Sequence, residues 1–195
     1  MAEDWDLFGW QTDAWGVTRY SLVIHAPADL TDRILAFRRE IGLGDLTSEP
    51  HVSLIASMHQ PMDLEVLKAA IRQTALALGP LRLDFPPGEV THRETGGSLP
   101  IVRTPDLLTF RQALVEAVKG HIQLTNPEKP FSPHVTLYQM AGATEAEAAR
   151  RIAPDHDFGD GFNAHRIDLV GRVGPPRGGT REVIAEFDLG AGTAS

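Results

Sequence analysis

The chain contains one five-residue pattern twice, as Pro50-His51-Val52-Ser53-Leu54 and again as Pro133-His134-Val135-Thr136-Leu137. A His-x-Ser/Thr triplet alone means little, because roughly one is expected by chance in a chain with eight histidines. Matching Pro, His, Val and Leu in register, with a hydroxyl at the fourth place of both copies, is expected well below once in about a thousand such chains. We therefore interpret the two segments as an internal repeat.

Both copies are predicted to lie in β-strands, at 50–57 and 133–140. Side chains alternate between the two faces of a strand, so each histidine shares a face with its hydroxyl residue, while Val and Leu point into a core. Each copy follows a helix and a polar loop and precedes another helix, so the surroundings repeat as well. If an internal two-fold relates the copies, two imidazoles and two hydroxyls converge on one cleft.

The rest of the chain interleaves strands and helices irregularly, which favours an α+β fold with antiparallel sheets. Helices are predicted from an Asp29 N-cap, from Asp63, from Thr104-Pro105 and from a Thr144/Glu147 capping box. The further predicted strands are 19–26, 81–85, 165–170 and 182–189, together with a hairpin over 89–104 that is broken at Gly96-Gly97.

Composition narrows the class of protein. With 195 residues, 42% of them hydrophobic, the chain fits one globular domain or two small lobes sharing a core. A formal charge of −8 argues against a protein that coats DNA or long RNA, because such binding rests on neutralising many phosphates. A short RNA end or a small nucleotide fits better. The absence of cysteine excludes disulfides and thiol nucleophiles.

The two ends are set apart from the predicted domain, 19–189. Residues 1–18 form an acidic arm with Trp5, Trp10 and Trp15, which either pins the arm to the body or forms a lid that stacks on a base. The tail, 190–195, contains mostly small residues. The acidic start does not resemble a signal peptide, and no apolar run reaches the roughly 20 residues of a membrane span. We expect a cytoplasmic monomer that binds no membrane.

The paired side chains suit the chemistry of a phosphodiester. One imidazole can take a proton from an attacking water while the other protonates the leaving alkoxide. The hydroxyls can donate to the non-bridging phosphoryl oxygens. We expect no metal or other cofactor, because neither histidine has a nearby set of His, Asp or Glu at ligand spacing. The alternative is that both are structural histidines, hydrogen-bonded to backbone at strand ends.

These strands resemble the 2H phosphoesterase superfamily, close to its 2′-5′ RNA ligase and RNA 2′,3′-cyclic phosphodiesterase group. The resemblance extends over about residues 19–189. It includes an opening strand at 20–24, Phe131-Ser132-Pro133 before the second motif, and a closing hairpin from Ile167-Asp168-Leu169 to Glu186-Phe187-Asp188-Leu189. It implies two pseudo-symmetric lobes, with antiparallel sheets facing a central cleft and helices outside.

The resemblance also implies roles for the repeated residues. His51 would be the proton donor, His134 the acceptor, and Ser53 and Thr136 the phosphate binders. The substrate would be a 2′,3′-cyclic phosphate at an RNA 3′ end or a small cyclic nucleotide, opened to a 2′-phosphomonoester. The alternatives are a 2′-5′ RNA ligase or 2′-5′ oligonucleotide phosphodiesterase, a non-catalytic nucleotide- or RNA-end-binding module, and a purely structural protein.

Further residues are candidates for substrate binding. Tyr138 lies two positions after Thr136, so it is predicted to share the cleft face and to stack on a base. Phe131 could stack in the same way or belong to the core. Arg103, just before a predicted helix, could bind a terminal phosphate through its paired donors, and His25 could line the cleft or cap its strand. The same phosphate role is open to Arg172, Arg177 and Arg181 in and beside a Gly/Pro loop.

Overall fold

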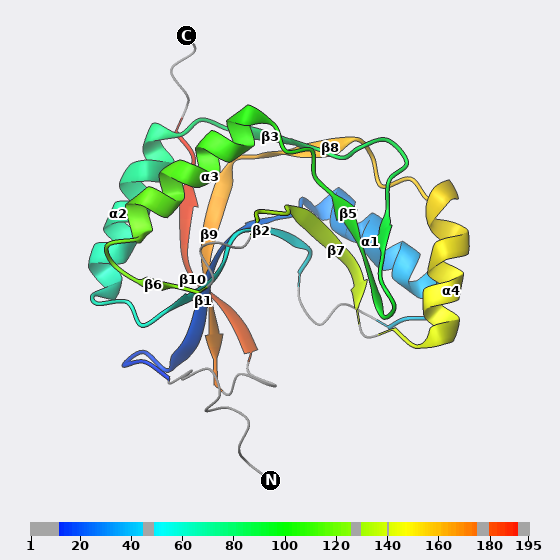
Figure 1. Cartoon of the computed structure of the whole chain (residues 1–195), viewed down its shortest axis with the longest axis horizontal. Coiled ribbons are helices and arrows are strands. Elements are labelled where there is room, and N and C mark those ends of the chain that lie inside the picture. The colour runs from blue at the N-terminus through cyan, green and yellow to red at the C-terminus, as the bar shows by residue number, and fades with distance from the viewer. Residues whose placement is uncertain (1–11, 45–48, 126–129, 140, 175–179, 191–195) are drawn as a thin grey trace.

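The computed structural model describes residues 12–44, 49–125, 130–139, 141–174 and 180–190 (Figure 1). Its helices are α1 (Ala28–Glu40), α2 (Leu64–Ala77), α3 (Pro105–Val118) and α4 (Ala143–Ile152), which continues into a 3-10 turn at Ala153–Asp155. Its strands are β1 (Val17–His25), β2 (His51–His59), β3 (Leu81–Asp84), β4 (Thr91–His92), β5 (Gly96–Pro100), β6 (Gln123–Leu124), β7 (His134–Gln139), β8 (Gly161–Ala164), β9 (Arg166–Val173) and β10 (Thr180–Asp188).

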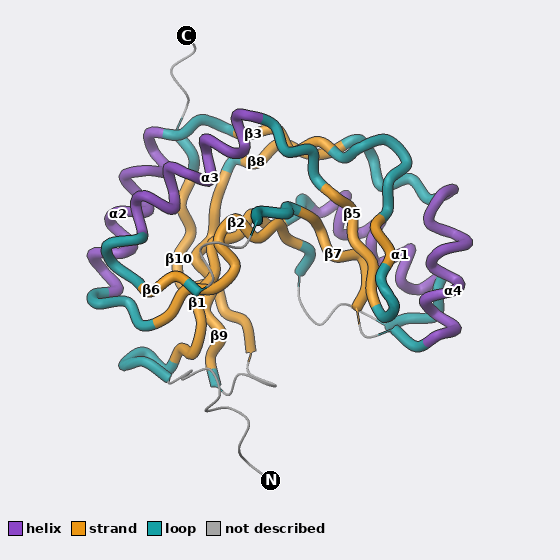
Figure 2. The backbone as a smooth tube through the Cα atoms, in the orientation of Figure 1, coloured by secondary structure: helices purple, strands orange, loops and turns teal. Residues whose placement is uncertain are grey.

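The strands form one large antiparallel sheet and one small one, which confirms the α+β class. The large sheet has the order β10-β9-β1-β2-β7-β5-β4, and β6 pairs with β2 beside this path. Strands β3 and β8 form a separate antiparallel pair. Figure 2 shows the strands in the middle of the molecule and the helices toward its outside.

The order of elements repeats along the chain. The series β1-α1-β2-α2-β3 is followed by β5-α3-β7-α4-β8, and in each series the first strand pairs with the third element, β1 with β2 and β5 with β7. The two halves meet where Val52 pairs with Val135, at equivalent positions of the repeat, and again where β3 pairs with β8. The two predicted sheets are therefore halves of one continuous sheet, which diverge from the β2–β7 pair (Figure 1).

The helices connect the two halves. Helix α1 precedes β2 in the chain but lies against β7, and α3 precedes β7 but lies against β2. Helix α2 packs on α3 and over β10. The apolar residues of helices and strands in both halves form one continuous cluster, among them Leu54, Leu137 and Phe37. The core is therefore shared between the halves and lies on the helix side of the sheet.

Two of the four predicted helix starts are capped as expected. The Asp63 carboxylate accepts the backbone N–H groups of Glu65 and Val66, and the Thr104 hydroxyl oxygen accepts that of Leu107. The other two predicted caps are wrong. Helix α1 begins after Pro27, with Asp29 in its first turn, and α4 begins after Gly142 without a side-chain cap.

Part of the N-terminal arm packs against the sheet. The Asp13 carboxylate accepts the backbone N–H groups of Trp15 and Val17, and it accepts the Tyr20 hydroxyl at 2.6 Å. Trp15 itself is 46% exposed. Trp5 and Trp10, the other tryptophans of the predicted arm or lid, lie outside the described residues. No helix in the described part of the chain is both long enough and apolar enough to span a membrane.

Candidate functional site

The two repeated patterns lie side by side on adjacent strands. Strands β2 and β7 pair antiparallel with Val52 opposite Val135, which places His51 opposite Thr136 and His134 opposite Ser53. The two histidines are therefore diagonal neighbours on the same face of the pair. On both strands the histidine and the hydroxyl residue are half-buried, while the valine and leucine between them are buried in the core. We call the sheet face that bears His51, Ser53, His134 and Thr136 the motif face.

Both imidazoles are held by the same local hydrogen bond. His51 Nδ1 lies 2.8 Å from the Glu49 carbonyl oxygen, and His134 Nδ1 lies 2.9 Å from that of Ser132. A carbonyl oxygen only accepts, so each Nδ1 carries a proton and donates. In a neutral imidazole this leaves Nε2 as the lone-pair nitrogen, which suits it to accept a proton.

A second contact is repeated with the halves exchanged. Arg111 on α3 donates from Nε to the Leu54 carbonyl in β2 at 3.0 Å, and Arg38 on α1 donates from Nη1 to the Leu137 carbonyl in β7 at 3.5 Å. Each arginine thus supports the motif strand of the other half. Sequence reasoning missed both residues, because the spacing from helix to motif differs between the two repeats.

Arg181 on β10 completes the surroundings of His51. Its Nη1 lies 2.9 Å from His51 Nε2, and since a guanidinium only donates, Nε2 accepts and the ring is neutral. Burial lowers the pKa of His51 to about 4, and the positive charge of Arg181 is the next largest cause, with smaller effects from His25 and His134. His51 is therefore a deprotonated imidazole at neutral pH.

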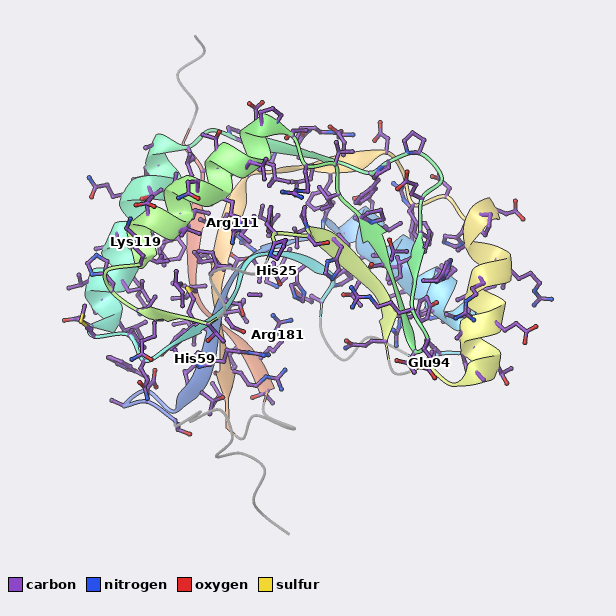
Figure 3. The ribbon with its side chains drawn as sticks, in the orientation of Figure 1. His25, His59, Glu94, Arg111, Lys119 and Arg181 are labelled. Carbon is purple, nitrogen blue, oxygen red and sulfur yellow. The ribbon has the colours of Figure 1, made fainter. Side chains whose placement is uncertain are left out.

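His25 lies beside His51 on the neighbouring strand. The two residues are direct partners in the β1–β2 pair, and their ring centroids are 6.1 Å apart with an edge-on orientation. His25 Nδ1 lies 2.6 Å from the carboxylate of Asp168, which is only 1% exposed and also contacts Arg166 at 3.0 Å. A buried carboxylate thus fixes the orientation of this third imidazole. Figure 3 shows His25 and Arg181 in the space between the two halves.

Tyr138 does not lie on the motif face, contrary to the prediction from strand alternation. In the β5–β7 pair, Ser98 is opposite Thr136 but Gly97 is opposite Tyr138, so one extra residue of β7 bulges out between them. A bulge reverses the alternation, and the Tyr138 ring is fully buried beside Phe37, 6.3 Å between centroids. Its hydroxyl pairs with His92 Nδ1 at 3.0 Å.

The remaining candidates differ in their surroundings. Phe131 is partly buried against the core, with the Arg111 guanidinium 4.6 Å above the centre of its ring. Arg103 is exposed in the loop before Thr104. Arg172 lies on β9, and Arg177 lies outside the described residues.

Comparison with known proteins identifies relatives of this arrangement. The family model of the 2′-5′ RNA ligase superfamily matches residues 15–176. The apo crystal structure of LigT from E. coli matches with a TM-score of 0.62 at 17% identity, covering 88% of this chain and 97% of LigT. TT0787 of Thermus thermophilus matches with a TM-score of 0.61 at 18% identity, covering 90% and 99%. At such identities these structures show a common fold. No curated protein sequence matches the chain.

Proposed function

The chain belongs to the 2′-5′ RNA ligase superfamily, whose members are phosphoesterases and ligases, and from this premise we propose that it hydrolyses 2′,3′-cyclic phosphates. The substrate is the cyclic phosphate of an RNA 3′ end or of a small cyclic nucleotide, and the product is the 2′-phosphomonoester. The observation that carries the proposal is the pair of histidines on adjacent strands, each with Nδ1 bound to a backbone carbonyl.

In this mechanism the proton moves between the Nε2 atoms and the substrate. A water attacks phosphorus and gives its proton to His51 Nε2, while a protonated His134 gives a proton from Nε2 to O3′ as the P–O3′ bond breaks. One P–O bond forms and one breaks, and the phosphate stays on O2′. The Ser53 and Thr136 hydroxyls share the face of the histidines, where they can donate to the non-bridging oxygens as charge gathers there.

The surroundings of His51 favour its role as the base. A group whose pKa is lowered to about 4 is deprotonated at neutral pH, and its Nε2 can accept the proton of the water once the Arg181 guanidinium turns from it to the substrate. The resemblance to the superfamily implied the opposite assignment, with His51 as donor. The contact with Arg181 supports exchanging the two roles in this proposal, because its guanidinium stabilises the neutral ring at Nε2.

His25 is proposed to bind substrate from the β1 side. Asp168 occupies its Nδ1, and Nε2, which lies 3.8 Å from the exposed Glu49 carboxylate, is the nitrogen that remains for a ligand near His51. A nucleotide ligand agrees with what has been crystallised with E. coli LigT, for which complexes with 3′-AMP, NADP+ and ATP are known.

The histidine pair can be tested by single substitutions. We expect His51→Ala and His134→Ala each to reduce kcat for a nucleoside 2′,3′-cyclic phosphate by at least about 100-fold, the lower range for loss of a general acid or base. His121→Ala, in the turn after α3, is the matched control and should keep wild-type turnover. Rates are measured by product chromatography, with thermal unfolding to verify the fold.

The outcomes separate the rival functions. Full turnover in either variant would refute the mechanism. Tight nucleotide binding by the wild type without turnover would indicate a binding module instead. Joining of a 2′,3′-cyclic phosphate end to a 5′-hydroxyl end would indicate a 2′-5′ ligase that uses the same pair, a function that the name of the matching family model supports.

A further inference from the structure

Three arginines form a row across neighbouring strands of the large sheet. Arg181 on β10 is the direct partner of Arg172 on β9, and Arg172 is in turn the direct partner of Arg19 on β1. Partners in an antiparallel pair project to the same side of the sheet, with Cβ atoms about 4.5–5.5 Å apart. Three guanidinium groups therefore project from one row on one face.

This row lies on the motif face. Along β1, Arg19 alternates with the core residues Tyr20 and Leu22 and so lies on the same side as Val23 and His25. Val23 is fully buried, yet it does not belong to the hydrophobic core cluster, which agrees with its position on the side opposite the helices. The contact of 2.9 Å between Arg181 and His51 connects the row to the histidine pair.

The row concentrates positive charge at an electrostatic cost. Like charges directly opposite one another destabilise a sheet. Burial lowers the pKa of Arg181, and the charges of Arg19 and Arg172 lower it further. The pKa of Arg19 is lowered in the same way, by burial and then by Arg172. Such a cluster is suited to a multiply charged anion, and the fork of guanidinium donors matches the oxygens of a phosphate group.

We propose that Arg19, Arg172 and Arg181 bind a second phosphate of the substrate, the one on the 5′ oxygen of the nucleoside whose cyclic phosphate lies between His51 and His134. This inference rests on the proposed function. The reacting phosphate already has two imidazoles and two hydroxyls, whereas the row spans three strands, about 10 Å, and begins beside His51. The substrate class is thus a 2′,3′-cyclic phosphate that also bears a 5′-phosphate, either as a free nucleotide or as the last residue of an RNA strand.

The test compares three substrates that differ at the 5′ oxygen. These are adenosine 2′,3′-cyclic phosphate, its 5′-phosphorylated form, and the dinucleotide ApA ending in a 2′,3′-cyclic phosphate. For the wild type we expect kcat/KM to be about 10- to 100-fold higher for a substrate with the second phosphate, the gain typical of hydrogen bonds to charged groups. A larger gain for the dinucleotide identifies an RNA end as the source, and a larger gain for the monophosphate identifies a free nucleotide.

Substitutions then show which residues are responsible for the higher kcat/KM of the phosphorylated substrates. Arg19→Gln and Arg172→Gln should each reduce the ratio of kcat/KM between phosphorylated and unphosphorylated substrates toward one, and Arg172→Lys should reduce it less. Arg82→Gln is the control, because Arg82 pairs with Asp84 and Asp160 at β3, which is not part of the large sheet. Thermal unfolding of every variant verifies the fold.

The results that would overturn the second phosphate site differ from those that would overturn the proposed hydrolysis. Equal kcat/KM for all three substrates in the wild type, or an unchanged ratio in the Arg19 and Arg172 variants, would overturn the second site. If the wild type hydrolyses none of the substrates, the proposed reaction fails, and calorimetry with adenosine 5′-monophosphate then decides on the site alone. Binding that is at least about tenfold weaker in Arg172→Gln supports the site, and equal binding overturns it.

Discussion

At the scale of single residues, one arginine makes two equivalent histidines chemically different. The two rings have the same hydrogen bond at Nδ1, but Arg181 contacts His51 at Nε2. Because the guanidinium can only donate, it favours the neutral ring there. The repeat thus supplies two imidazoles, and in the proposed mechanism a residue from outside the repeat determines which of them is the base.

This difference predicts the acidic limb of the pH–rate profile. The value of kcat/KM reports the free enzyme, so it should fall only as pH drops toward about 4, where His51 becomes protonated. In Arg181→Gln a neighbouring positive charge is gone and protonation of His51 becomes easier. The acidic limb should therefore move to higher pH, toward the ordinary histidine pKa of 6.5. Profiles of wild type, Arg181→Gln and the control Arg82→Gln check this. A limb that stays in place in Arg181→Gln would mean that His51 is not the base.

The residues of the motif face were predictable from the sequence to different extents. His51, Ser53, His134 and Thr136 were predicted from a local pattern and the alternation of side chains along a strand. Arg181 was a candidate only as one of several arginines, because its contact with His51 joins segments 130 residues apart. A contact at that separation depends on the path of β9 and β10, which no local pattern encodes.

At the scale of elements, a single bulge in β7 determines the side of the sheet on which the Tyr138 ring lies. The alternation of side chains along a strand predicted that the Tyr138 ring lies on the motif face. The extra residue of β7 opposite β5 reverses this alternation, so the ring lies in the core. Gly97 leaves space for it, since a Cβ at this position would lie 2.3 Å from Tyr138 Cε1. Gly97 can be read from the sequence, but the space that it leaves for Tyr138 could not be inferred without knowing that β5 pairs with β7.

This packing predicts how much a methyl group added at Gly97 destabilises the fold. We expect Gly97→Ala to lower the free energy of unfolding by about 1–3 kcal/mol, because the Tyr138 ring is fully buried and bonded to His92, so it has no room to move aside. Gly120→Ala is the control, since nothing lies within 4 Å of its added Cβ, and its effect should stay within about 0.5 kcal/mol. Urea unfolding measures both. An equally small effect at Gly97 would argue against the bulged packing.

The helix starts were predictable from the sequence only in part. Asp63 and Thr104 cap their helices through hydrogen bonds to residues two or three positions away, which a sequence pattern contains. Asp29 and Thr144 were expected to do likewise, but α1 begins after Pro27 and α4 after Gly142, each slightly earlier. Asp29 instead pairs with Arg33 within the first turns of α1.

At the scale of the whole molecule, the two halves share one core. The cluster of buried apolar residues runs without interruption from the helices of one half to the strands of the other. Internal symmetry was predictable from the repeated pentapeptide. The crossing of α1 to β7 and of α3 to β2 was not, because either half could have kept its own helix without any change in the local pattern.

A shared core predicts a single unfolding transition. Leu54→Ala in β2 and Leu137→Ala in β7 should each lower the free energy of unfolding by about 2–5 kcal/mol and shift the whole transition, because both side chains are buried in the same cluster. Scanning calorimetry should give one peak in the wild type and in both variants, with equal calorimetric and van't Hoff enthalpies. Two separable peaks would show that the halves unfold independently.

The exchanged helices bear on how two histidines in equivalent positions can have different surroundings. Helix α1 of the first half packs on β7, and helix α3 of the second half packs on β2, an exchange like that of a domain-swapped dimer but within one chain. Two separate identical copies would have to surround both histidines identically. A single chain that contains both halves does not have this constraint. A segment that occurs only once in it, such as β10 with Arg181, can contact one histidine and not the other. In the proposed mechanism, carrying the repeat on one chain thus allows one histidine to be the base and the other to be the acid.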